Sequence, residues 1–229
     1  RRLTAELRRE TCFHEAGHAV AFALGGVPVL KLAVAPEGAD SWRTDIRTGR
    51  CCSDLWGLCE KADLVFPRPF LRWLGSEGAL HPDGRGFEEL LETPLGKTLL
   101  EGFTPAHRGE IRAQAVGLLG GPTAEQIYRG DPVRLLNRLD LNDVSRAVGL
   151  CRFLPPPQAE FARNLHRIEE AFRSPQIWDF VRALADDLER NGELRAELRT
   201  RLPAAIPGWL SDQGNDRNRI IWQGMPPNS

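Results

Sequence analysis

Two histidines four residues apart, His14 and His18, constrain this chain more than any other feature. They lie inside residues 4–25, where apolar and small residues recur at helical spacing between a capping Thr4 and a glycine pair, which predicts one helix. Four residues make just over one helical turn, so both imidazoles project from one face and can bind one metal ion. Glu15 directly follows the first histidine, where it can take a proton from water that the metal activates.

Gly17 lies in the middle of this predicted helix. A glycine there costs roughly 1 kcal/mol relative to alanine. Its presence predicts that another element approaches the helix closely beside the two histidines.

A catalytic zinc ion usually has a third protein ligand and one position open to water. His81 and His107 lie in an irregular stretch and His166 on a polar helix face, so we expect all three at the surface. Asp140 and Asp143 stand at the start of a predicted helix. Either carboxylate can turn toward the metal, and either can simply cap the helix. Spacing alone does not choose between these roles.

The remaining pattern predicts a mainly α fold with a small β-hairpin or sheet, of the α+β class. Residues 27–35 read as a strand, with 49–52 as its return partner, and the punctuated stretch 53–107 reads as an irregular insertion. The helices that we expect after it are 108–119, ended by Gly120-Gly121-Pro122, then 123–128, about 141–153, 158–173 and 175–190. Residues 1–205 would form one domain, and 206–229 a polar C-terminal tail.

Composition excludes several classes of protein. The 30 Lys and Arg residues against 31 Asp and Glu give a net charge of −1, which argues against a protein that coats nucleic acid. Glycines, a proline and Lys31 interrupt the longest apolar stretch, 19–35, so no membrane span is expected. Five cysteines, with Cys51 and Cys52 adjacent, suit a reducing compartment, and we expect a cytoplasmic protein.

Three blocks of sequence resemble the peptidase domain of FtsH-type ATP-dependent zinc metalloproteases. The first runs from His14 to Val20 and is followed by a strand that ends in Ala35-Pro36-Glu37-Gly38. The second is residues 110–130, with a glycine pair and then Ala124-Glu125, and the third is Asn142-Asp143 followed by Ala147. The resemblance covers about residues 10–55 and 108–200.

This resemblance implies a zincin-like helical metallopeptidase domain. His14, His18 and Asp143 would hold Zn²⁺, with Asp140 as the alternative third ligand, and Glu15 would be the general base. Glu125 would lie near the metal and orient a ligand histidine without binding the metal itself. The family carries an ATPase module, and these 229 residues show no counterpart of it. The expected partners are therefore a polypeptide substrate and a separate ATPase, unfoldase or regulatory protein.

Two functions follow as hypotheses. The first is a zinc-dependent endopeptidase, in which an extended peptide pairs with the edge of the strand at 27–35. The alternative is a zinc-binding regulatory or interaction protein that keeps the peptidase fold but cleaves little. The presence of Glu15 favours the first, because a purely structural metal site needs no base.

Overall fold

The computed structural model describes residues 2–45, 51–52, 56–77, 87–136, 138 and 141–211, with residues 51, 52, 87 and 88 described by their backbone alone. The described part of the chain is mainly helical and carries a small antiparallel sheet, as the sequence predicts. Its helices are α1 (Ala5–Leu24), α2 (Arg68–Ser76), α3 (Phe87–Glu92), α4 (Pro94–Glu101), α5 (Pro105–Arg129), α6 (Asn142–Cys151), α7 (Pro157–Arg173), α8 (Pro175–Asn191) and α9 (Leu198–Arg201). Its strands are β1 (Val29–Val34), β2 (Thr44–Asp45), β3 (Cys51–Cys52), β4 (Gly57–Lys61) and β5 (Glu193–Leu194).

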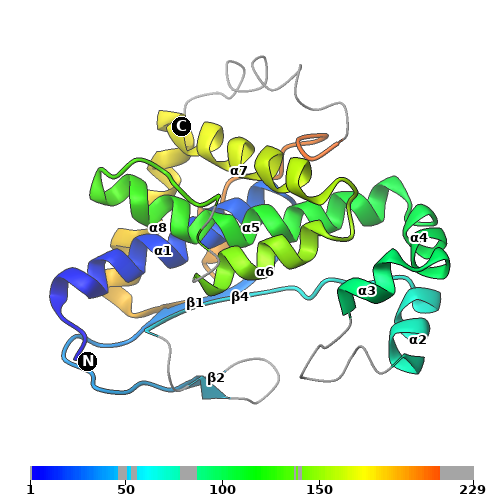
Figure 1. Ribbon diagram of the computed structural model, residues 1–229. Coiled ribbons are helices and arrows are strands. Elements are labelled where there is room, and N and C mark those ends of the chain that lie inside the picture. The colour runs from blue at the N-terminus through cyan, green and yellow to red at the C-terminus, as the bar shows by residue number, and fades with distance from the viewer. Residues whose placement is uncertain are drawn as a thin grey trace.

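Helices α1, α5, α6, α7 and α8 stack on one another beside the sheet, and α2, α3 and α4 gather at one end of the molecule (Figure 1). The predicted first helix is confirmed as α1, where the Thr4 side chain accepts a hydrogen bond from the Leu7 backbone N–H at 3.2 Å. One apolar core joins α1 to α5, α7 and α8. No helix within the described ranges is both long and apolar enough to cross a membrane.

The sheet has the order β4-β1-β5, with both pairs antiparallel. The prediction of a strand at 27–35 is confirmed, but its predicted return partner is wrong. Residues 51–52 pair with β2 instead, and β4 pairs along β1. As a result β1 is the central strand, and β4 forms an edge of the sheet in the part of the chain that the structure describes. The predicted peptide-binding edge at 27–35 is therefore occupied.

The prediction that Gly120-Gly121-Pro122 ends a helix is wrong, because α5 runs through all three residues. These glycines serve contact between helices. A Cβ on Gly120 would lie 2.5 Å from the Cβ of Ala21 on α1, and a Cβ on Gly17 would lie 2.4 Å from that of Ala124. Two helices that cross at glycine can approach closely without displacing side chains. The close approach expected at Gly17 is thus confirmed.

We expect Gly117→Ala to destabilise the protein by about 1–3 kcal/mol, since overpacking a tight contact forces neighbours to move. A Cβ at this position would lie 2.0 Å from the ring of the buried Phe22. Gly109→Ala on the same helix is the matched control, because a Cβ there meets nothing within 4 Å. That control should stabilise by about 0.5–1 kcal/mol. Urea unfolding of both variants tests this, and equal midpoints would contradict it.

The stretch 53–107 contains more order than the sequence predicts. Besides β4 it carries α2, α3 and α4, which share a second apolar cluster with the start of α5 and the residues after α6. Phe66, Phe70, Phe103 and Phe153 meet in this cluster, with ring centroids 5.0–5.6 Å apart for four of the pairs. The segment thus builds one end of the molecule and supplies an edge strand.

The first residues of the predicted tail belong to the core. Ile206, Trp209 and Leu210 are buried against it, and the Ile206 N–H donates to the carbonyl of Leu24 at the end of α1. The folded unit therefore extends at least to Leu210. Residues 212–229, the rest of the predicted tail, lie outside the described residues.

Candidate metal centre

Three donor atoms from two helices converge at one point. The Nε2 atoms of His14 and His18 on α1 are 3.0 Å apart. Oδ2 of Asp143, in the first turn of α6, lies 3.3 Å from each of them. His18 is buried, whereas His14 and Asp143 are partly exposed, so the group is open to solvent on one side. This group is able to hold a metal ion.

The other ring nitrogens identify the tautomers. Nδ1 of His18 lies 2.8 Å from the carbonyl oxygen of Gly117, and Nδ1 of His14 lies 3.0 Å from Oε2 of Glu125. A carbonyl or carboxylate oxygen can only accept, so each Nδ1 carries the proton and donates it. The Gly121 N–H also lies 3.3 Å from Nδ1 of His18, but the shorter contact to the carbonyl decides the tautomer. In the neutral rings both Nε2 lone pairs therefore face Asp143.

The spacing suits zinc. Three tetrahedral ligands at about 2.0–2.1 Å from a zinc ion stand about 3.3–3.4 Å from one another. The observed separations of 3.0, 3.3 and 3.3 Å are close to this. Two lone pairs 3.0 Å apart repel each other unless a cation or a proton lies between them. The donor set and its geometry thus fit a small divalent cation.

The electrostatics of the site favour a positive charge at the same point. Burial lowers the pKa of His14, but hydrogen bonds to Asp143 and Glu125 outweigh it and raise that pKa to about 10. Burial raises the pKa of Asp143, yet the two histidines hold it far below its ordinary value. A metal ion must displace a proton to bind here. The cation then takes the place of that proton between the imidazoles and the carboxylate.

Glu15 projects into the same cavity, which has a volume of about 210 Å³ and also touches His14, His18 and Asp143. Burial raises the pKa of this carboxyl, against the lowering influence of the two histidines. A carboxyl with a raised pKa is a stronger base than an ordinary glutamate. Strand β4 passes directly over it, since a Cβ on Gly57 would lie 2.4 Å from Oε1 of Glu15. Glycine at this position leaves room for the carboxylate beneath the strand.

Glycines of α5 pack directly against the ring of His18. A Cβ on Gly121 would lie 2.3 Å from Nε2 of His18, so only glycine leaves space for this ring. Pro122 follows and has no N–H for the carbonyl of Leu118. Gly121, in a segment whose sequence pattern predicts a helix break, therefore leaves the space that the His18 ring occupies.

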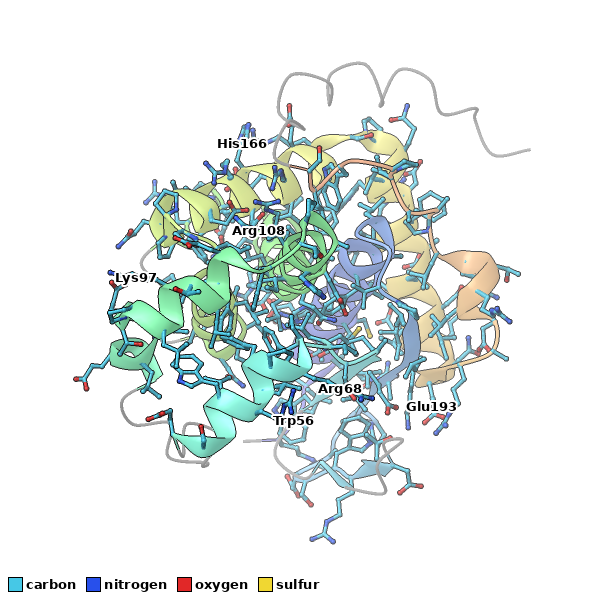
Figure 2. All side chains as sticks on the ribbon, turned by 90° about the vertical axis from the view of Figure 1, so that its right-hand side faces the viewer. Trp56, Arg68, Lys97, Arg108, His166 and Glu193 are labelled. Carbon is cyan, nitrogen blue, oxygen red and sulfur yellow. The ribbon has the colours of Figure 1, made fainter. Side chains whose placement is uncertain are left out.

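The structure brings together most of the residues singled out from the sequence. His14, His18, Asp143 and Glu15 share one cavity, and Glu125 reaches His14 from behind. Asp140, the alternative ligand, and His81 lie outside the described residues. His107 is partly exposed and forms a capping box with Thr104 at the start of α5. His166 is exposed on α7, on the opposite side of the molecule from Trp56 (Figure 2).

Sequence reasoning missed the far wall of the cavity. Strand β4 contributes Leu58, Cys59 and Lys61, and α6 contributes Arg146. The carbonyl of Gly117, which orients His18, was missed as well. No side-chain pattern reveals a backbone acceptor. The β4 residues fell in a stretch that appeared irregular, and only their pairing with β1 places them at the site.

The fold and the site together define a mainly helical α+β protein with a His-His-Asp group suited to a metal ion. No protein-family model matches the chain, and no curated protein matches it either.

We expect Glu125→Ala to weaken metal binding by about 10–100-fold, the usual effect of removing a group that orients a ligand histidine. Glu125→Gln should cost less, because the amide oxygen can still accept from Nδ1 of His14. Glu10→Ala is the matched control. Both glutamates bond to Arg129, at 2.6 and 2.8 Å, but only Glu125 contacts His14. Competition with a zinc chelator measures each affinity, and equal losses for the two alanine variants would refute the role of Glu125.

Proposed function

We propose that this protein is a zinc-dependent endopeptidase, of the kind that the resemblance to FtsH-type peptidase domains implies. The observation that carries the proposal is the convergence of His14, His18 and Asp143 at 3.0–3.3 Å, with Glu15 in the same cavity. Glu125 behind His14 adds support, because such carboxylates orient metal-binding imidazoles.

The proposed chemistry divides between the metal and the chain. When bound at such a site, zinc activates water for attack and polarises a carbonyl group. Glu15 accepts a proton from the attacking water and passes it to the leaving amine. Its burial beneath β4 excludes bulk water from the carboxylate and raises its pKa, which suits both transfers.

In this proposal, the substrate backbone binds along the edge of β4. Leu58 and Cys59 of this strand line the cavity that holds the metal group. In the described part of the chain β4 has a sheet partner on the β1 side, and its other side is an edge of the sheet. An extended peptide that adds to this edge pairs through its main chain, which gives affinity with limited sequence preference. The carbonyl to be cleaved would then lie beside Glu15 and the His14, His18 and Asp143 side chains that would hold the metal.

Metal analysis and removal test the proposal. We expect one zinc per chain in the purified protein, and no peptide hydrolysis after exhaustive treatment with 1,10-phenanthroline. Hydrolysis should return on addition of zinc and not of magnesium, because imidazole ligands favour zinc over magnesium. Iron in place of zinc would contradict the assignment of the metal. Zinc without hydrolysis of any peptide would favour the alternative, a zinc-binding regulatory protein.

A further inference from the structure

A second cavity opens beside the metal group. It has a volume of about 380 Å³ and shares Lys61, Leu118 and Arg146 with the cavity that contains Glu15. The two cavities are therefore neighbours that have these three residues in common. We call this second cavity the side pocket.

The side pocket is lined mainly by apolar side chains. They come from the residues after β4, from α5, and from α6 and the residues after it: Leu64, Phe66, Leu118, Leu150 and Phe153. The rings of Phe66 and Phe153 are 5.0 Å apart and belong to the second apolar cluster. Its volume lies at the lower end of the roughly 300–1,000 Å³ of ligand pockets, which suits one large side chain.

Two cations stand where the cavities meet. Lys61 donates to the carbonyl of Ala62 at 3.3 Å, and its ammonium lies 5.7 Å from the centre of the Phe22 ring. Arg146 is exposed and reaches Oδ1 of Asp143 at 3.9 Å, a carboxylate that both site histidines also contact. Burial and then the charge of Arg146 lower the pKa of Lys61, so the two cations repel each other. An anion placed between them relieves this repulsion.

A third cavity also touches His14 and has an acidic lining. Its volume is about 200 Å³, its lining includes Glu10, Glu15 and Glu125, and Arg129 bonds to the first and last of these. Lys and Arg side chains are absent from the described lining of this cavity. Of the cavities beside His14, the one lined by Lys61 and Arg146 therefore offers the cations that can hold a substrate carboxylate.

We propose that the site selects peptides in which a large apolar residue, seated in the side pocket, neighbours a carboxylate held by Lys61 and Arg146. This inference rests on the proposed peptidase function and adds the class of its substrates. The carboxylate can come from an acidic side chain or from the C-terminus of a peptide. Lys61 and Arg146 are then the residues that determine specificity.

Matched peptides test the selection by two independent readouts. Cleavage by the zinc-loaded protein is compared for peptides that contain Phe-Glu, Phe-Gln or Ala-Glu at the centre, each with both ends blocked. Binding of the same peptides to the Glu15→Gln variant is measured by fluorescence anisotropy. We expect Phe-Glu to exceed Phe-Gln by about tenfold, the value of one hydrogen bond to a charged group. It should exceed Ala-Glu by about tenfold or more, the value of burying a large apolar side chain. A Phe-Gln peptide that ends just after the glutamine, as the free acid or the amide, tests the terminal carboxylate.

Single substitutions test which residues determine the preference for an apolar residue next to a carboxylate. Lys61→Gln and Arg146→Gln should each lower the Glu-to-Gln ratio toward one, and Lys97→Gln should leave it unchanged. Lys97 is an exposed lysine on α4 whose side chain pairs with Glu92 (Figure 2). Gly149→Phe should abolish the preference for Phe over Ala, because residue 149 lines the side pocket and a Cβ there meets nothing within 4 Å. Gly149→Ala is its control.

The outcomes separate this inference from the peptidase proposal. Equal cleavage of the Phe-Glu and Phe-Gln peptides would overturn the inference and leave the peptidase intact. No cleavage of any peptide, but preferential binding of Phe-Glu, would overturn the peptidase and support the recognition site. A preference that follows only the free C-terminus would support the site and identify a terminal carboxylate as its ligand. Neither cleavage nor binding would overturn both.

Discussion

Glu15→Gln is expected to lower kcat for peptide hydrolysis by about 10²–10⁴-fold, the usual contribution of a general base. The amide has nearly the same shape as the carboxylate but cannot accept a proton at neutral pH. It therefore fits beneath β4, where a Cβ on Gly57 would lie 2.4 Å from Oε1 of Glu15. Because the converging donor atoms come from His14, His18 and Asp143, zinc stoichiometry should stay at one per chain.

The measurement combines peptide cleavage with elemental analysis on the same preparation. Glu6→Gln is the matched control, since Glu6 lies in the exposed first turn of α1, away from the cavity. That variant should keep full activity and full zinc. If Glu15→Gln cleaves peptides at the rate of the parent protein, Glu15 is not the base. If it loses zinc as well, the expectation that Glu15 does not hold the metal is wrong.

Asp143→Ala is expected to weaken zinc binding by more than the roughly 100-fold that a supporting group contributes. Its carboxylate is the one acidic member of the converging group, at 3.3 Å from both histidines. Without it, two neutral imidazoles hold a divalent cation with no compensating charge from a ligand. Asp143→Asn should fall between the parent and the alanine variant, because an amide oxygen is a weaker ligand.

Two further variants control this experiment. Asp179→Ala removes an exposed carboxylate of α8 that pairs with Arg182, and zinc content should not change. Asp140→Ala tests the alternative ligand that the sequence left open, and we expect it to keep its zinc. Retention of zinc by Asp143→Ala together with loss in Asp140→Ala would reverse the assignment of the third ligand.

The local pattern of the sequence was sufficient for the helix that carries the site. Spacing alone places His14 and His18 on one face, and Thr4 begins α1 where a capping residue is expected. Gly17 predicted that another element packs closely against α1, and in the structure that element is α5. These features depend on residues about one helical turn apart. Local sequence therefore determines them independently of the rest of the fold.

The same local reasoning failed where glycine served a tertiary contact. Gly120 and Gly121 read as a helix break, because glycine and proline weaken an isolated helix. In the folded protein α5 continues through them, since the contacts with Ala21 and His18 need the absence of a Cβ. The packing of α1 against α5 outweighs the low helix propensity of glycine and proline. A single sequence does not show which helices pack against each other.

What the sequence by itself determined was the pair of histidines, the adjacent glutamate and the mainly helical class, all of which follow from periodicity. Only the tertiary structure brings Asp143 of α6 and Glu125 of α5 to His14, across 129 and 111 residues of chain. It alone places β4 at an edge of the described sheet and brings Lys61 and Arg146 into the lining of both cavities. The physical reason is that these contacts join segments whose local patterns are independent, and only the burial of a shared core selects their arrangement.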